Sequence, residues 1–116
     1  MEKTTVIKIF GIAACDTVKK VKNAMDDKNI KYDFINFKIH SPTKELILKW
    51  KKAIGDWPVN KKGPTYRKIK LDFEKATDQK KITLLINNSS AIKRPIVEKN
   101  GEFLFIGNDL EALNKL

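Results

Sequence analysis

The first 37 residues alternate between strand-like and helix-like patterns, and this alternation narrows the possible folds. Residues 4–10, TTVIKIF, are rich in β-branched and aromatic side chains, which is typical of a strand, and Gly11 ends it. Apolar residues then recur at helical spacing from Asp16 to Asn29, and residues 31–37, KYDFINF, form a second strand. A strand, a helix and a strand in such close succession predict a βαβ unit with parallel strands and a right-handed crossover.

The middle of the chain loses the strand pattern and favours helices. Ser41-Pro42-Thr43 offers a helix start with the proline in the first turn, and Gly55 ends this helix. Residues 56–70, DWPVNKKGPTYRKIK, contain two prolines and a glycine, so we expect a loop with at most a short turn. Residues 72–87 are predicted to be helical again, in one piece or in two pieces divided near Ala76–Asp78. The side chains expected to be buried on these helices are Leu46, Ile47, Trp50, Ala53, Ile54, Phe73, Ala76, Ile82, Leu85 and Ile86.

The C-terminal part returns to strand chemistry. Residues 95–105, PIVEKNGEFLF, contain two strand runs around an Asn-Gly pair, which is a strong signal for a hairpin. A short helix is expected to begin at Asn108 or Asp109. This order of elements predicts an α/β fold of the thioredoxin-like (glutaredoxin-like) type, with a mixed four-stranded sheet. We expect a single domain over residues 1–116, with a helical insertion over approximately residues 41–90.

Composition excludes several classes of protein. The chain has 116 residues, 41% of them hydrophobic, and is long enough to bury a core without a metal or disulfide staple. One cysteine forms no internal disulfide, and one cysteine with one histidine leaves too few ligands for zinc, so we expect no bound metal or other cofactor. Lys8 interrupts the short N-terminal apolar stretch, which argues against a signal peptide, and no segment reaches the ~18 apolar residues of a membrane span. We therefore expect a cytoplasmic protein with no membrane partner.

The net charge of +10 raises the question of an anionic partner. The lysines are scattered from Lys3 to Lys115 instead of being gathered on one helix. That distribution favours a solvated surface or a small anionic ligand over a nucleic acid. A basic nucleic-acid binder stays open as an alternative.

The single cysteine, Cys15, lies where the first strand meets the first helix. The free N–H groups of a helix start stabilise a thiolate, which is the reactive form of cysteine. A free thiol with a pKa near 8.5 is about 3% ionised at pH 7, and lowering that pKa by two units requires about 2.7 kcal/mol. A helix terminus stabilises a charge by ~0.3–1 kcal/mol and by at most ~2, which is not enough. We therefore expect a cation from elsewhere in the chain to stabilise the thiolate. We also expect Thr17 to cap the helix or to hydrogen-bond the sulfur. The alternative is a buried structural cysteine that acts as a small hydrophobe.

Three segments together resemble the arsenate reductase/Spx (ArsC-like) family, and within it the YffB-like branch: FGIAACDTVKKVKNAM, GPTYRKIK and IKRPIVEKNGEFLFIG. The resemblance covers nearly the whole chain and implies a thioredoxin-like domain with a helical insertion. It implies that Cys15 is a redox nucleophile. It also implies that Arg67 and Arg94 bind an oxyanion or the carboxylates of glutathione, and that Pro95 after Arg94 is cis.

By this resemblance the protein is a glutathione-dependent thiol/disulfide reductase, with glutathione as co-substrate and a small oxyanion or a glutathionylated molecule as substrate. Val18 stands where a C-x-x-C motif has its second cysteine, so an adduct on Cys15 must be resolved by outside glutathione or a glutaredoxin. We expect a monomer.

Two further alternatives stay open. One is a glutaredoxin-coupled arsenate reductase, although the segment after the last strand, FIGNDLEAL, lacks the third arginine of such enzymes. The other is a non-enzymatic, Spx-like regulator that binds RNA polymerase, although Spx-type regulators commonly carry the second cysteine that this chain lacks.

Overall fold

The computed structural model describes residues 5–115, which form two compact units. Of the described residues, one unit contains 5–36 and 94–115, and the other is Phe37–Lys93. The first unit holds β1 (Ile7–Gly11), α1 (Asp16–Asp27), β2 (Asp33–Asn36), β3 (Ile96–Lys99), β4 (Glu102–Ile106) and α5 (Leu110–Asn114). The second holds α2 (Lys44–Ile54), α3 (Pro64–Lys75), α4 (Asp78–Asn87) and the short 3-10 helix η1 (Ser89–Ala91).

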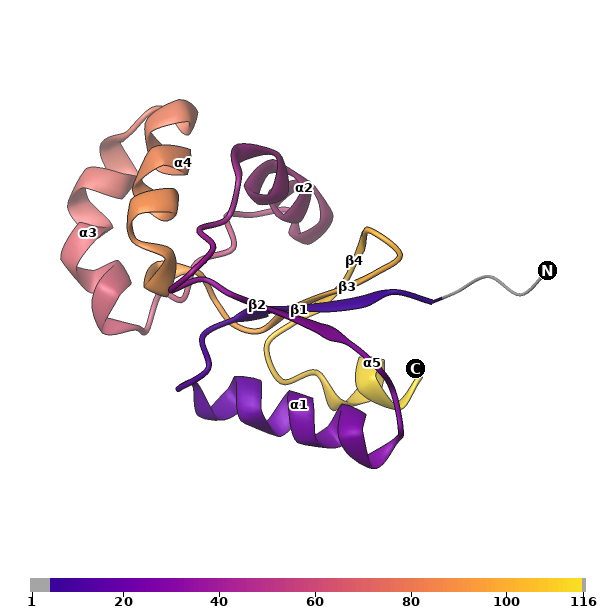
Figure 1. The fold of residues 1–116 in the computed structure, drawn as a ribbon. Helices are drawn as coiled ribbons and strands as arrows, with labels where there is room; N and C mark the ends of the chain where they lie inside the picture. Colours follow the sequence, from indigo (N-terminus) through magenta and orange to yellow (C-terminus); the bar gives the residue numbers. More distant parts are fainter. Residues whose placement is uncertain (1–4, 116) are drawn as a thin grey trace. The chain divides into compact units, whose positions relative to one another are not determined.

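The first unit is built on a four-stranded mixed sheet in the order β2-β1-β3-β4 (Figure 1). β1 and β2 are parallel and are joined through α1, whereas β3 is antiparallel to both β1 and β4. The predicted βαβ unit and the α/β class are therefore confirmed. The predicted strand over residues 4–10 begins at Ile7, and Thr4 lies outside the described residues.

One face of this sheet carries the core of the first unit. Successive strand residues point to opposite faces, so Ile7 and Ile9 of β1 share a face with Val97, which pairs with Ile9. α1 and α5 both cover that face (Figure 1). The buried side chains packed there are Ile7, Ile9, Val21, Met25, Val97, Phe105 and Leu113.

The predicted hairpin is confirmed, and its turn residues are the reason. Asn100 has φ 54° and Gly101 has φ 81°, the left-handed conformations that a two-residue hairpin turn requires. The Asn100 side-chain oxygen accepts a hydrogen bond from the Val6 N–H at 2.9 Å, and the Asn100 N–H donates to the Val6 carbonyl at 2.8 Å. These bonds fix the turn against the start of β1. The predicted C-terminal helix is also present, with Asp109 as its N-cap.

The second unit contains the expected helices, but two of their starts differ from the prediction. α2 begins after Thr43, whose hydroxyl accepts from the Leu46 N–H at 3.2 Å, so Pro42 precedes the helix instead of lying in its first turn. Gly55 ends α2 with φ 86°, as expected. The predicted burial of Trp50 is confirmed.

The prediction of a loop over residues 56–70 is wrong for its second half. α3 begins at Pro64, because proline at the first helical position has a suitable φ and needs no N–H partner. The proline was interpreted as a helix breaker, although it starts this helix. The predicted division near Ala76–Asp78 is confirmed, and Thr77 caps α4 by accepting from the Lys80 N–H at 3.3 Å.

Burial in the helical unit largely follows the sequence pattern. Phe73, Ile82 and Leu85 are buried as expected. The expected burial of Ala53 is wrong, because this residue is exposed near the end of α2. Four more of the expected residues are only half-buried: Leu46, Ile54, Ala76 and Ile86. No helix among residues 5–115 is long and apolar enough to cross a membrane. The expectation that the two units form one domain stays a prediction.

Candidate functional site

Cys15 occupies the N-cap position of α1, as the sequence predicted. Its backbone is extended, with φ −78° and ψ 125°, and its carbonyl accepts the first helical hydrogen bond from the Lys19 N–H at 3.0 Å. The Cys15 N–H donates to the carbonyl of Ile12 at 3.0 Å, which closes the turn between β1 and α1. The residue is half-buried. The thiol therefore lies at the positive end of a helix and is not enclosed in the core.

Three groups act on the Cys15 sulfur against the effect of burial. Burial raises the pKa of the Cys15 thiol, since desolvation disfavours the thiolate. The Val18 N–H, the Arg94 side chain and the Thr17 N–H lower that pKa through hydrogen bonding, and the charge of Arg94 lowers it further. The lowering effects prevail, so the pKa of Cys15 lies below its ordinary value. The arrangement favours the nucleophilic form of the sulfur.

The two N–H groups belong to the second and third positions of α1. A side chain at the N-cap normally accepts from one of these two groups. Cys15 makes no regular capping hydrogen bond, so its sulfur has only looser contacts with the N–H groups of Thr17 and Val18. The predicted hydrogen bond between Thr17 and the sulfur thus comes from the backbone N–H of Thr17. Val18 lies three positions after the N-cap, where the backbone N–H is free to face the cap residue. Sequence analysis considered Val18 only as the residue that replaces the second cysteine of a C-x-x-C motif.

Strand pairing places Arg94 beside the thiol. Phe10 of β1 pairs with Ile96 of β3, so the Arg94-Pro95 segment lies alongside Gly11, where β1 ends. The Arg94-Pro95 peptide bond is cis, which confirms that prediction. The Pro95 carbonyl accepts from the Gly107 N–H at 2.8 Å, beyond the end of β4. Arg94, 79 positions after Cys15 in the sequence, therefore supplies the cation that we expected near the thiol.

Gly11 is a functional position that sequence analysis did not identify. A Cβ atom built on Gly11 would lie 2.7 Å from a Val18 methyl carbon and 3.8 Å from the Arg94 Cβ. The first distance is far below van der Waals contact, and Val18 is fully buried, so any shift of its side chain must disturb the surrounding core. The absence of a side chain at Gly11 thus allows α1 to approach the end of β1 closely.

Arg67 lies in the second unit, on the exposed surface of α3. Its N–H donates to the Gly63 carbonyl at 3.2 Å, in the first turn of that helix. Its role in binding an anion stays a prediction. Among the described residues, no group of three or more His, Cys, Asp or Glu side chains is placed to hold a metal ion.

Comparison with known proteins agrees with this geometry. A sequence model described as the ArsC family matches residues 10–116, which include the thiol, its helix and the Arg94-Pro95 segment. The chain belongs to the ArsC family. An uncharacterized protein of Haemophilus influenzae is 29% identical over 108 residues, covering 91% of this chain and 95% of that protein.

Solved structures support the same assignment. The structure of the YFFB protein is 29% identical, with a TM-score of 0.80 over 94% of this chain and 96% of that one. A possible arsenate reductase from Streptococcus mutans is 27% identical, with a TM-score of 0.75 over 90% of this chain and 92% of that one. The fold is thus the thioredoxin-like fold of the ArsC family, and the chain is related to arsenate reductases.

Replacing Arg94 should raise the pKa of the Cys15 thiol. In the native protein, the midpoint of iodoacetamide alkylation against pH should lie below that of the urea-unfolded chain. Arg94→Ala should move the native midpoint upward, because it removes both a hydrogen bond and a positive charge, while Arg94→Lys should move it less. Lys93→Ala, which removes the neighbouring exposed cation, should leave the midpoint unchanged. Equal midpoints in native and unfolded protein would contradict the described environment of the sulfur.

Gly11→Ala should destabilise the first unit and disturb the thiol together. The added methyl group must displace Val18, and overpacking of this kind costs about 1–3 kcal/mol of unfolding free energy. Because the Val18 N–H favours the thiolate, the alkylation midpoint should also rise. Urea denaturation and the pH profile measure the two effects, with Ala13→Ser as a control that adds one atom at an exposed position. A normal midpoint in a destabilised Gly11→Ala protein would separate the two roles and contradict the proposed link.

Proposed function

We propose that the protein is a glutathione-dependent thiol/disulfide reductase with Cys15 as its nucleophile. The observation that carries this proposal is the lowered pKa of a half-buried thiol at the start of α1, beside Arg94. A purely structural cysteine gains nothing from a neighbouring guanidinium group, whereas a nucleophile does. Membership of the ArsC family supports the same assignment.

The proposed reaction has two exchange steps. In the first, the Cys15 thiolate attacks the glutathione sulfur of a mixed disulfide, forming a Cys15–glutathione disulfide and releasing the other sulfur as a thiolate, which takes a proton from water. In the second, the thiolate of a free glutathione attacks the glutathione sulfur of this adduct, which yields glutathione disulfide and regenerates the Cys15 thiolate. The substrate sulfur is thus reduced to a thiol, one free glutathione is consumed, and it leaves as a disulfide with the glutathione unit that came from the substrate.

Resolution by an outside thiol follows from the cysteine content. The chain has one cysteine, so no second thiol of this chain can attack the adduct. The adduct must therefore be resolved by an outside thiol, and we propose glutathione or a glutaredoxin. We propose that the protein acts in the cytoplasm, as a monomer and without a resident cofactor.

The remaining site residues are proposed to bind glutathione. The guanidinium group of Arg94 matches a carboxylate with two parallel hydrogen bonds, and Arg67 is assigned to the same task by the family resemblance. Pro95 and Thr17 are assigned to the surface that receives the tripeptide. Each arginine should therefore contribute to the KM for glutathione, whereas only Arg94 has a described effect on the thiol pKa.

Reduction of a glutathionylated peptide at pH 7, coupled to glutathione reductase and NADPH, tests the proposal. Wild-type protein should accelerate the reaction, Cys15→Ser should reduce it to the uncatalysed rate, and Arg94→Ala should lower kcat/KM about tenfold or more. Arg67→Ala should raise the KM for glutathione with little change in kcat. Mass spectrometry of wild-type protein without reductant should show one glutathione added at Cys15.

Lys93→Ala is the matched control, because it removes an exposed positive charge next to Arg94 in the sequence and should retain full activity. A wild-type rate equal to that of Cys15→Ser would refute the proposal.

Arsenate reduction is the second candidate, favoured by the similarity to the possible arsenate reductase of Streptococcus mutans. It predicts NADPH oxidation that depends on arsenate and a glutaredoxin. If neither activity is present and RNA polymerase copurifies with the protein, the Spx-like regulator is favoured.

A further inference from the structure

The second unit contains a cavity that the reductase chemistry does not use. Its volume is about 440 Å³, which is within the ~300–1,000 Å³ range of small-molecule sites. It lies between the segment that precedes α3, one side of α3 and the first half of α4. Its lining residues are Asp56, Trp57, Val59, Lys61, Tyr66, Lys70, Phe73, Glu74 and Lys81.

Three aromatic side chains form one wall of this cavity. The Trp57 and Phe73 rings meet edge to face with centroids 5.9 Å apart, and the Tyr66 and Phe73 rings do so at 5.7 Å. Tyr66 and Phe73 are buried, which holds the wall rigid, whereas Trp57 is half-buried. A partly exposed indole on a rigid aromatic support is a suitable surface for stacking a planar ligand.

Lysine side chains gather around the aromatic wall. The Lys51 ammonium lies over the Trp57 ring, 4.7 Å from its centroid. The Lys81 ammonium lies over the Trp57 and Phe73 rings, 5.7 Å and 5.4 Å from their centroids. Lys61 and Lys70 line the same cavity, and Lys61 forms a 3.8 Å ion pair with Asp56. That pair is exposed, so it holds Lys61 only weakly. The cavity therefore offers several flexible cations next to an aromatic surface.

The cavity also contains two carboxylates, those of Asp56 and Glu74, which can accept hydrogen bonds. Burial raises the pKa of Tyr66, and the nearby carboxylates of Glu74 and Asp56 raise it further. The phenol therefore remains protonated and can donate a hydrogen bond. A ligand that fits must present an anion to the lysines, a flat ring to Trp57, and hydrogen-bond donors to the two carboxylates.

We propose that this cavity binds a nucleoside phosphate. The base stacks on Trp57 in place of the exposed end of a lysine side chain that lies over the ring. The phosphate lies among Lys61, Lys70 and Lys81, and Asp56 or Glu74 accepts hydrogen bonds from ribose hydroxyls or an exocyclic amino group. Inorganic phosphate matches only the lysines, and an aromatic carboxylate leaves both acidic side chains without donors. The nucleoside phosphate is the common class that supplies all three features. This site is independent of the proposed reductase activity and does not involve Cys15.

Indole N–H signals in a proton–nitrogen correlation spectrum test the proposal. The chain has two tryptophans, so two such signals are expected, and Trp57→Phe identifies the one of interest. Trp50 is fully buried and serves as an internal control. Adenosine monophosphate should shift the Trp57 signal saturably and leave the Trp50 signal in place. Adenosine and inorganic phosphate, each added alone, should bind at least about tenfold more weakly.

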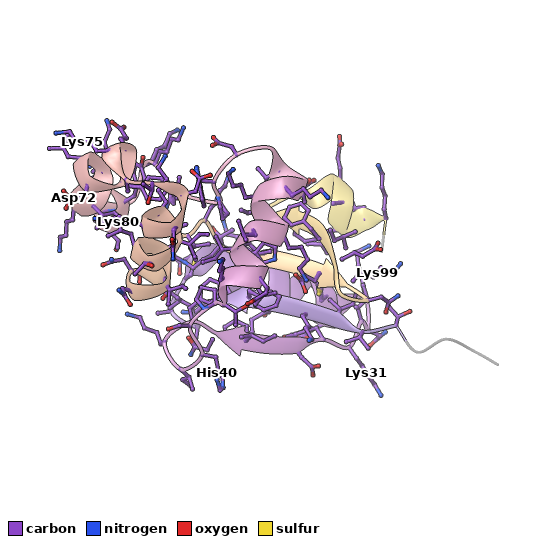
Figure 2. All side chains as sticks on the ribbon, turned by 90° about the horizontal axis from the view of Figure 1, so that it is seen from above. Lys31, His40, Asp72, Lys75, Lys80 and Lys99 are labelled. Carbon is purple, nitrogen blue, oxygen red and sulfur yellow. The ribbon has the colours of Figure 1, made fainter. Side chains whose placement is uncertain are left out.

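Matched lysine variants locate the binding site. Lys81→Gln and Lys70→Gln should each weaken binding of adenosine monophosphate several-fold, up to about tenfold. Lys80→Gln is the control, because Lys80 lies beside Lys81 in α4 but borders a different groove with Asp72 and Lys75 (Figure 2). A retained spectrum in each variant shows that it is folded. Lys81 lies over the Trp57 and Phe73 rings, so its loss could weaken binding by disturbing those rings. In that case Lys70→Gln shows whether the positive charge itself is needed for binding.

Several outcomes would overturn the proposal. These are an unchanged Trp57 signal, equal binding of inorganic phosphate or of adenosine, and equal weakening by Lys80→Gln. Cys15→Ser should bind adenosine monophosphate as wild type does, so a failure of the reductase proposal leaves this test intact. Conversely, if the cavity does not bind adenosine monophosphate, the result of the disulfide-exchange assay is unaffected.

Discussion

The contact between Arg94 and the Cys15 sulfur is the interaction on which the lowered pKa of the thiol, and with it the proposed chemistry, depends. A helix start alone stabilises a thiolate by at most ~2 kcal/mol, and burial of the sulfur works in the opposite direction. The helix N–H groups and the guanidinium must therefore act together to leave the pKa below its ordinary value. Removing either contribution from a half-buried thiol returns it toward the neutral, unreactive form.

The sheet is what makes this contact possible between residues so far apart in the sequence. Pairing of β1 with β3 brings the Arg94-Pro95 segment next to the end of β1, and α1 begins a few residues later. Gly11 has no side chain, so Val18 can pack against the strand end and direct its N–H toward the sulfur. The same hydrophobic packing that stabilises the unit thus also fixes the geometry around the thiol.

Local patterns predicted most of the elements, because their causes are local. Asn100-Gly101 requires positive φ values wherever it occurs between strands, and Thr77 caps a helix through its own hydroxyl. The start of α3 was missed because Pro64 suits a first helical turn as well as a loop, and only packing of Tyr66 and Phe73 decides between them. The thiol site was predicted in part. An N-cap cysteine can be recognised from sequence, but the place of Arg94 came from family resemblance, and the close approach at Gly11 depends on tertiary structure.

An arginine at position 94 has an advantage that a lysine would lack. The sulfur uses only part of the hydrogen-bonding capacity of a guanidinium group, which has several N–H donors in a fixed plane. In the proposed function, the same planar group also pairs with a carboxylate or an oxyanion that approaches the thiol, while its charge continues to favour the thiolate. One side chain can in this way couple substrate binding to activation of the nucleophile. The chain has 24 basic residues but only two arginines, Arg67 and Arg94, so this capacity is concentrated at the two positions that the family resemblance assigns to anion binding.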